Sequence, residues 1–160
     1  MKILLICGES GVGKSTIAHN LGQYATKYKL IKSYTDRPKR PKEYDHIFVD
    51  KDVMDFLPIK DIAAFTKING YRYCALYSQF DDDKINVYVV DAPGIADTFK
   101  AFPDAEIEIV LIKRTNVYID EERKNRNIIL PLEDKTIHIV DNNSTIMDAV
   151  NDIRQIYEVS

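Results

Sequence analysis

Short apolar runs alternate along the chain with segments whose apolar residues recur at helical spacing. Continuous apolar runs predict buried parallel strands at 3–7, 86–91, 105–112 and 136–140. Segments with one apolar side predict helices after Lys14, from about Gly94 and over 145–158. The shared side consists of Ile17, Leu21, either Tyr24 or Ala25, and Tyr28 in the first helix, and of Ile146, Val150, Ile153 and Tyr157 in the last. This alternation predicts an α/β fold, with a parallel central sheet and helices on both faces.

The middle of the chain departs from this rhythm. Residues 30–34 are predicted to form a second strand, but the stretch "TDRPKRPKEYD" after it is unsuited to regular structure, because Pro38 and Pro41 lack amide donors. Asp50 is placed to cap a short helix, and Asn69-Gly70 between two β-rich runs predicts a hairpin. We therefore predict a small antiparallel insert, at roughly 44–77, on the parallel core.

The segment "GESGVGKST" at 8–16 follows the first predicted strand and opens the first predicted helix. It matches G-x-x-x-x-G-K-[ST], the P-loop pattern, in which glycines let backbone amides turn toward phosphates. The Lys14 ammonium is expected to act catalytically on the β- and γ-phosphates of ATP, and the Ser15 hydroxyl is expected to bind Mg²⁺. The predicted ATP phosphate-binding residues are Ser10, Gly11, Val12, Gly13, Lys14, Ser15 and Thr16.

Asp91 ends the predicted strand "NVYVVD", the place of a Walker-B type magnesium ligand. An aspartate at a strand-to-helix junction is also a common helix cap, and both interpretations stay open. The sequence "DAPG" imitates the D-x-x-G of GTP switches, but the chain contains no N-K-x-D to bind guanine. A GTP switch is therefore the less favoured alternative.

A second cationic segment, "SYTDRPKRP", suggests a second phosphate site. Arg37 and Arg40 frame a proline-stiffened turn, so their guanidinium groups are able to converge on one phosphate at low entropic cost. A solvated basic loop is the alternative, and the presence of the P-loop favours the phosphate site.

These motifs together resemble the guanylate kinase family. The stretch "SYTDRPKR" is similar to that family's S-x-T-T-R-x-P-R, "YDHIFV" to D-Y-x-F-V, "INGYRY" to x-G-N-Y-Y-G, and "VVDAPGI" to L-D-I-D-x-Q-G. The matches follow the same order over nearly the whole chain. The resemblance implies a P-loop three-layer kinase fold and transfer of the ATP γ-phosphoryl group to a nucleoside monophosphate (NMP).

The resemblance also implies roles for particular residues. Arg37, Arg40 and Tyr73 would hold the acceptor phosphate, Ser33 would touch the base, and Asp91 would be catalytic. Arg123 and Arg126 resemble catalytic arginines of the family's lid, although an ordinary charged surface beside Glu121, Glu122 and Lys124 is the alternative. The implied division is a core at 1–32, 84–113 and 135–160, an NMP-binding insert at about 33–83 and a short lid at about 114–134, all within one domain, 1–160.

The departures from the family concern the acceptor base. Ala64 stands where guanylate kinases place a guanine-binding Glu, so we expect an acceptor other than GMP. Thr66, on the same strand face, is a candidate to replace part of that contact. His46 stands at the phosphate-binding Tyr of D-Y-x-F-V, and phosphate binding and a structural role are weighed equally.

Composition adds limits on location and partners. The formal net charge of −3 gives no reason to expect nucleic acid as a partner, and no apolar stretch is long enough to predict a membrane span. Cys7 and Cys74 lack metal-site or disulfide spacing and fit a cytoplasmic protein. No oligomeric state is indicated. The favoured hypothesis is a Mg²⁺-dependent enzyme that uses ATP and an NMP or dNMP, and a catalytically silent protein-binding module is its rival.

Overall fold

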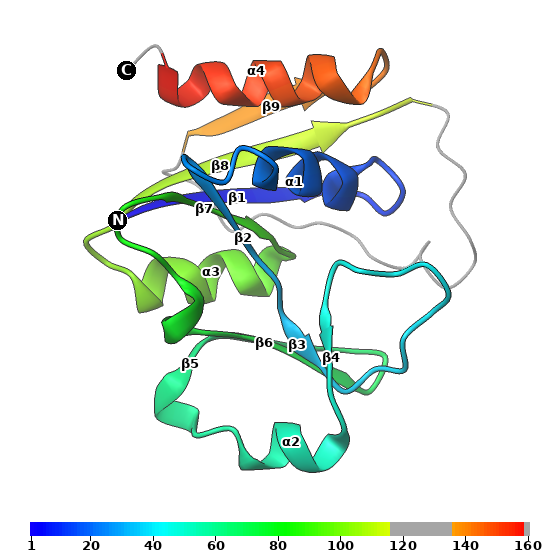
Figure 1. Cartoon of the computed structure of the whole chain (residues 1–160), viewed down its shortest axis with the longest axis vertical. Helices are drawn as coiled ribbons and strands as arrows, with labels where there is room; N and C mark the ends of the chain where they lie inside the picture. The colour runs from blue at the N-terminus through cyan, green and yellow to red at the C-terminus, as the bar shows by residue number, and fades with distance from the viewer. Residues whose placement is uncertain (116–135, 159–160) are drawn as a thin grey trace.

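A parallel sheet forms the centre of the molecule. The structure, a computed structural model, describes residues 1–115 and 136–158 (Figure 1). Within them, parallel strands pair in the order β2-β7-β1-β8-β9. Their bounds are β1 (Lys2–Gly8), β2 (Tyr28–Ile31), β7 (Ile85–Val89), β8 (Glu106–Lys113) and β9 (Ile137–Asp141). The predicted parallel α/β core is confirmed.

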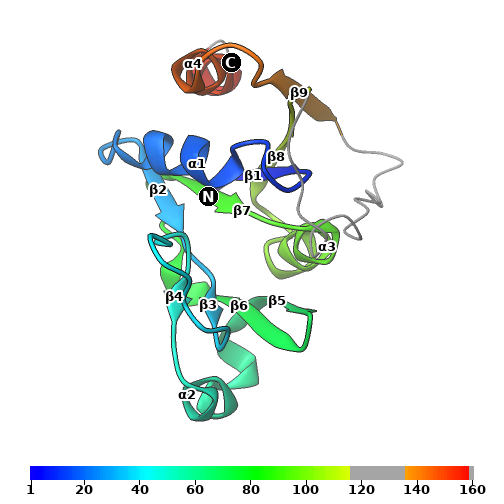
Figure 2. The same ribbon diagram turned by 90° about the vertical axis from the view of Figure 1, so that its right-hand side faces the viewer.

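Helices cover both faces of this sheet. Figure 2 shows α1 (Lys14–Gly22) and α4 (Ile146–Glu158) on one side and α3 (Ala92–Ala101) on the other. The buried strand β1 serves both faces, because successive side chains point in opposite directions. Leu4 and Ile6 pack in the core with α1 and α4, whereas Leu5 and Cys7 pack in the core with α3.

A second sheet lies beside α3, in the order β4-β3-β6-β5. Its strands are β3 (Tyr34–Thr35), β4 (Ile47–Phe48), β5 (Ile62–Ile68) and β6 (Tyr71–Leu76), and α2 (Lys51–Phe56) precedes β5. Asn69 and Gly70 join β5 to β6 with φ values of 51° and 82°, so the predicted hairpin is confirmed. The sheet is not wholly antiparallel, because β3 and β4 run parallel.

Two predicted elements differ more from the observed elements than the others do. The predicted strand 30–34 is divided: β2 ends at Ile31 and β3 begins at Tyr34 in the other sheet. The predicted first helix ends at Gly22, before Tyr24, consistent with the poor helix propensity of glycine. Tyr28 nevertheless packs in the same core as α1, so its predicted burial is confirmed although it belongs to β2.

Hydrogen bonds join the two sheets through α3 and the residue before it. The Thr66 hydroxyl donates to Asp91 Oδ2 over 3.2 Å, and the Phe65 amide donates to Asp97 Oδ2 over 3.0 Å. Ala64 and Ala75 of the second sheet are buried in the α3 core. The second sheet is therefore fixed beside the carboxyl end of β7, close to where the phosphate loop leaves β1.

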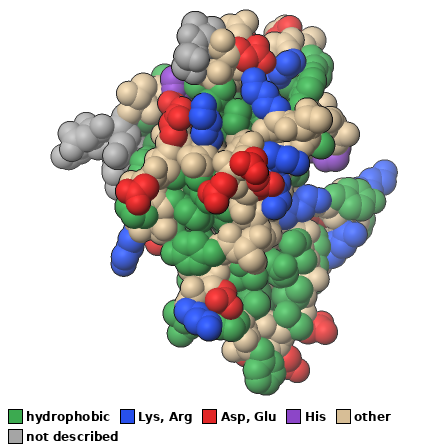
Figure 3. Space-filling view, turned by 60° about the vertical axis from the view of Figure 1, so that its left-hand side comes forward, with side chains coloured by type: hydrophobic (Ala, Val, Ile, Leu, Met, Phe, Trp, Pro, Cys, Tyr) green, Lys and Arg blue, Asp and Glu red, His purple; other side chains and the backbone are tan. Residues whose placement is uncertain are grey.

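One surface feature lies away from the loop. Figure 3 shows hydrophobic side chains gathered over the lower half of one face. A hollow of about 680 Å³ is lined by residues of α2, β5, β6 and α3, including Met54, Leu57 and Phe65. Among the described residues, no helix is both long enough and apolar enough to cross a membrane.

Candidate functional site

The loop between β1 and α1 depends on glycine at two points. Gly13, the cap residue of α1, has a φ of 98°, and Gly11 has a φ of 83°. L-residues with side chains rarely adopt these values. The Gly13 cap makes no side-chain hydrogen bond to the first turn of α1. A helix start of this kind is suited to bind an anion through its backbone amides and its positive dipole end.

Asn142 braces this loop from the far edge of the sheet. It follows β9 and is 3% exposed, and its side-chain amide donates to the Val12 carbonyl over 2.7 Å. A Cβ atom on Gly13 would lie 2.6 Å from Asn142 Nδ2, closer than atoms pack. Asn142 was not predicted from the sequence, because nothing in "DNNS" distinguishes it from a turn residue.

The two residues expected to act on phosphate and metal lie at the start of α1. Lys14 Nζ donates to the carbonyls of Gly8 (2.8 Å) and Glu9 (2.7 Å), so the ammonium folds back over the loop. The Ser15 hydroxyl donates to Asp45 Oδ2 over 3.0 Å. Asp45 belongs to residues 36–46 between β3 and β4, which also carry Arg37 and Arg40 and are called the basic segment below. This contact therefore joins the phosphate loop to the basic segment.

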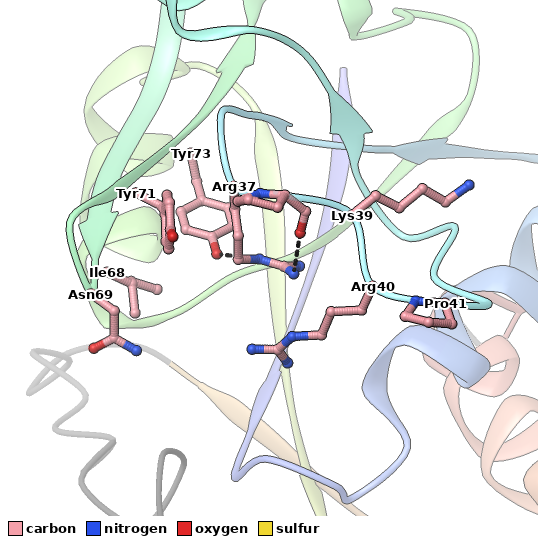
Figure 4. A pocket seen from close by; sticks show the side chains of 9 residues that line it. Arg37, Lys39, Arg40, Pro41, Ile68, Asn69, Tyr71 and Tyr73 are labelled. Carbon is pink, nitrogen blue, oxygen red and sulfur yellow. Dashed lines mark hydrogen bonds between the residues drawn. The ribbon is translucent and has the colours of Figure 1, made fainter.

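The basic segment and the hairpin enclose a cavity of about 340 Å³ (Figure 4). Its lining residues are Arg37, Pro38, Lys39, Arg40, Pro41, Ile68, Asn69, Tyr71 and Tyr73. Arg37 Nε donates to the Tyr73 hydroxyl over 2.9 Å, and Nη1 donates to the Pro38 carbonyl over 3.2 Å. The structure therefore brings together Arg37, Arg40 and Tyr73, three of the predicted acceptor-phosphate residues.

Glu43 occupies the guanidinium fork of Arg37. Nη1 donates to Oε2 over 3.0 Å, Nη2 donates to Oε1, and the Arg40 amide also donates to Oε2, over 3.1 Å. The hydrogen bonds to Glu43 are the main cause that raises the pKa of Arg37. Burial alone would raise the pKa of Glu43, but the Arg37 and Arg40 hydrogen bonds outweigh it and lower that pKa. The site thus already holds a bidentate anion at Arg37.

A second acid fixes the start of the basic segment. The Asp36 side chain is 3% exposed and accepts hydrogen bonds from Arg72 of β6, at 2.8 Å from the amide and 2.7 Å from Nε. These bonds outweigh burial and lower the pKa of Asp36. The segment is therefore attached to the second sheet immediately before Arg37.

Ser33, predicted to touch the base, and Asp91, predicted to be catalytic, have partners within the protein. Ser33 is buried, and its hydroxyl lies 2.9 Å from the Tyr88 hydroxyl. Asp91 Oδ1 accepts from the Gly94 amide over 3.0 Å, so the helix-capping alternative is observed, while Oδ2 accepts from Thr66. Ala64, at the expected guanine-binding position, is 3% exposed.

His46 lies beside the acceptor residues and beside Asp45. Its ring is 5.3 Å from that of Tyr73, edge to face, and its Nδ1 lies 3.1 Å from Asp45 Oδ1. The predicted lid arginines, Arg123 and Arg126, lie outside the described residues, so their roles stay predictions.

The fold and the loop define a P-loop protein of the α/β class, and comparisons with known proteins narrow the class. No protein-family model matches the chain. A guanylate kinase of Hydrogenovibrio crunogenus is 27% identical over 119 residues, which are 68% of this chain and 57% of that protein. A guanylate kinase of Aromatoleum aromaticum is 30% identical over 113 residues, 64% of this chain and 54% of that protein. The chain thus aligns with little more than half the length of these relatives.

Structural similarity covers more of the molecule. The crystal structure of guanylate kinase from Anaplasma phagocytophilum superposes with a TM-score of 0.70, covering 99% of this chain and 85% of that one at 18% identity. That likeness shows the fold. The resemblance predicted from the motifs is confirmed: the chain is guanylate kinase-like in sequence and in architecture.

Proposed function

We propose that this protein is an ATP-dependent nucleoside or deoxynucleoside monophosphate kinase of guanylate-kinase type. The observation that carries the proposal is the hydrogen bond between Ser15 and Asp45, 3.0 Å long. It ties the donor-phosphate loop to the segment that carries Arg37 and Arg40. A protein that only binds or hydrolyses a triphosphate has no need for a second cationic cradle attached to the first.

The donor half follows from the loop. Backbone amides from Ser10 to Thr16 would bind the ATP phosphates at the start of α1, and Lys14 would leave the loop carbonyls for the β- and γ-oxygens. The hydroxyl oxygen of Ser15 is a suitable ligand for Mg²⁺, which prefers hard oxygen ligands. Bound there, Mg²⁺ would neutralise charge on the β- and γ-phosphates.

The acceptor half follows from the cavity. Arg37, Arg40 and Tyr73 would orient the NMP phosphate, whose anionic oxygens resemble the carboxylate that Glu43 presents to Arg37. In the transfer, an acceptor oxygen attacks the γ-phosphorus while the bond to the β–γ bridging oxygen breaks, and ADP leaves. Positioning and charge neutralisation supply most of the catalysis in such reactions, and we assign part of the neutralisation to Arg123 and Arg126.

The acceptor base is expected to differ from guanine. Ala64 offers no carboxylate to pair with guanine donors. Ser33 and His46 would touch the acceptor nucleotide, together with Thr66, whose hydroxyl donates to Asp91. A buried site that lacks its hydrogen-bond partner loses selectivity for the corresponding base. We therefore propose that the acceptor is a nucleoside monophosphate other than GMP, and that it is either a ribonucleotide or a deoxynucleotide.

A coupled ADP-release assay with Mg²⁺ and ATP tests this proposal against a panel of ribo- and deoxynucleoside monophosphates. We expect turnover with at least one acceptor, and its loss in Lys14→Ala. Normal ATP binding without turnover on any acceptor would reject the kinase and favour the silent protein-binding module. Release of phosphate from GTP without an acceptor would instead favour a GTP switch.

A further inference from the structure

Asp45 faces the phosphate loop and is not one of the residues that line the acceptor cavity. It lies between β3 and β4, in the segment that also carries Arg37 and Arg40, but its Oδ2 is directed to the phosphate loop and accepts from the Ser15 hydroxyl over 3.0 Å. We propose that Asp45 binds, together with Ser15, the divalent cation that enters with the donor nucleotide. This inference rests on the nucleotide-binding part of the proposed function.

The spacing of the two oxygen atoms suits a shared ion. Magnesium holds oxygen ligands at about 2.0–2.1 Å in an octahedron, which places neighbouring ligands about 2.9 Å apart. Ser15 Oγ and Asp45 Oδ2, at 3.0 Å, have that separation before any ion arrives. An ion therefore replaces one hydrogen bond and requires little movement of either side chain.

The same carboxylate also has a neighbouring side chain at its second oxygen. Its other oxygen, Oδ1, lies 3.1 Å from His46 Nδ1. Carboxylates that bind metal ions commonly have such a neighbouring group beside the oxygen that does not face the metal.

Other nearby carboxylates are less suited to this role. Asp91, the residue expected from the sequence, accepts from Gly94 with one oxygen and from Thr66 with the other. Glu43 has a potential ligand atom within 4.8 Å of those of Asp45 and His46, yet both its oxygens are paired with Arg37, whose charge would repel a cation. Within the part of the chain that the structure describes, Asp45 is the carboxylate that contacts Ser15.

Asp45 thus couples the two halves of the site. Because one segment carries both the metal-binding carboxylate and the acceptor-binding Arg37, a metal that binds with the nucleotide would hold this segment in its present place beside α1. Ordering of the acceptor cavity and binding of the donor would then support each other.

The test measures metal-dependent binding of a fluorescent ADP analogue, with EDTA and with Mg²⁺, and Mn²⁺ affinity of the ADP complex by electron paramagnetic resonance. The variants are Asp45→Asn, which keeps the shape, Asp91→Asn, and Asp52→Asn on the exposed surface of α2 as a matched control. We expect Asp45→Asn to lower Mn²⁺ affinity about 10- to 100-fold, the range typical of disturbed metal sites. With EDTA its ADP affinity should equal or exceed that of the wild type, because a negative charge near the phosphates is gone.

The contrary results are distinct. Unchanged Mn²⁺ affinity in Asp45→Asn, or an equal loss of ADP affinity with EDTA and with Mg²⁺, would overturn the proposal, the second by showing a merely structural role. A large loss of Mn²⁺ affinity in Asp91→Asn alone would assign the metal to Asp91. Wild-type protein that binds Mn²⁺ and ADP with the expected Asp45 dependence, but phosphorylates no acceptor, would reject the kinase and retain this site. Failure of the wild type to bind ADP at all would overturn both.

Discussion

Replacing Gly13 by alanine should disrupt the phosphate loop through two separable effects. The residue has a φ of 98°, which costs an alanine about 1 kcal/mol relative to glycine. The added Cβ would also lie 2.6 Å from Asn142 Nδ2, so the amide must move and its 2.7 Å bond to the Val12 carbonyl is lost. Leaving that buried carbonyl unpaired costs about 1–3 kcal/mol. We expect Gly13→Ala to lower the free energy of unfolding by about 3 kcal/mol in total.

Gly70→Ala is the matched control. Gly70 also has a positive φ, 82°, but nothing lies within 4 Å of the position its Cβ would take. It should therefore lose only about 1 kcal/mol, the conformational part. In a protein that already carries Asn142→Ala, the amide is absent, so Gly13→Ala should lower the free energy of unfolding by only about 1 kcal/mol. The double-mutant cycle should therefore give a coupling energy of about 2 kcal/mol between positions 13 and 142.

Urea unfolding followed by circular dichroism gives the four stabilities of the cycle, and fluorescent ADP binding gives the functional counterpart. Gly13→Ala should bind ADP weakly, whereas Gly70→Ala should bind it like the wild type. The reasoning fails if Gly13→Ala costs no more than Gly70→Ala. It also fails if the coupling to Asn142 is within about 0.5 kcal/mol of zero, the usual limit of additivity.

Three further predictions concern the acceptor site and its surroundings. Arg37→Ala should raise the acceptor KM at least about tenfold, since a charge-assisted hydrogen bond is worth about 1.5–3 kcal/mol. Steady-state kinetics measure this, with the exposed Lys67→Ala as the control, and an acceptor KM in Arg37→Ala equal to that of the wild type would contradict it. Ala64→Glu should lower the free energy of unfolding by about 3 kcal/mol or more, because Ala64 is 3% exposed and the new carboxylate is buried; unchanged urea unfolding would contradict that burial. Because the pKa values of Asp36 and Glu43 are lowered in the folded protein, these groups stabilise the fold at pH values above their ordinary pKa values of 3.8 and 4.5. The free energy of unfolding should therefore decline as the pH falls below about 4.5. A urea midpoint that stays constant from about pH 6 to about pH 3 would contradict this prediction.

The core was predictable because its sequence signals are local. A continuous apolar run such as 3–7 has few alternatives to a buried strand, and Asn69-Gly70 supplies the backbone conformation of a tight hairpin. The division of 30–34 between two sheets was not predictable in this way. Apolar and β-forming residues continue through that segment, and only tertiary packing decides that β2 pairs with β7 and β3 with β6.

The site shows the same contrast. The phosphate loop was found because its chemistry requires glycines and a lysine at fixed spacing. Asn142 and Asp45 were missed as functional residues because their partners, Val12 and Ser15, are distant in the sequence. The sequence contains one signal for Asp45, the D of the D-Y-x-F-V match, but in that match a role was predicted only for His46.

The acids of the basic segment change how its charge should be understood. The sequence suggested that this segment is mainly cationic. In the structure, however, Asp36 attaches the segment to β6, Glu43 pairs with the Arg37 guanidinium group, and Asp45 contacts Ser15. Each acid fixes one point of the segment relative to another element, and each also reduces the local positive potential. With a formal net charge of −3, the molecule has little long-range attraction for an anionic acceptor. Affinity for a phosphate must therefore come from short-range contacts at Arg37, where the phosphate has to replace the Glu43 carboxylate that occupies the guanidinium fork.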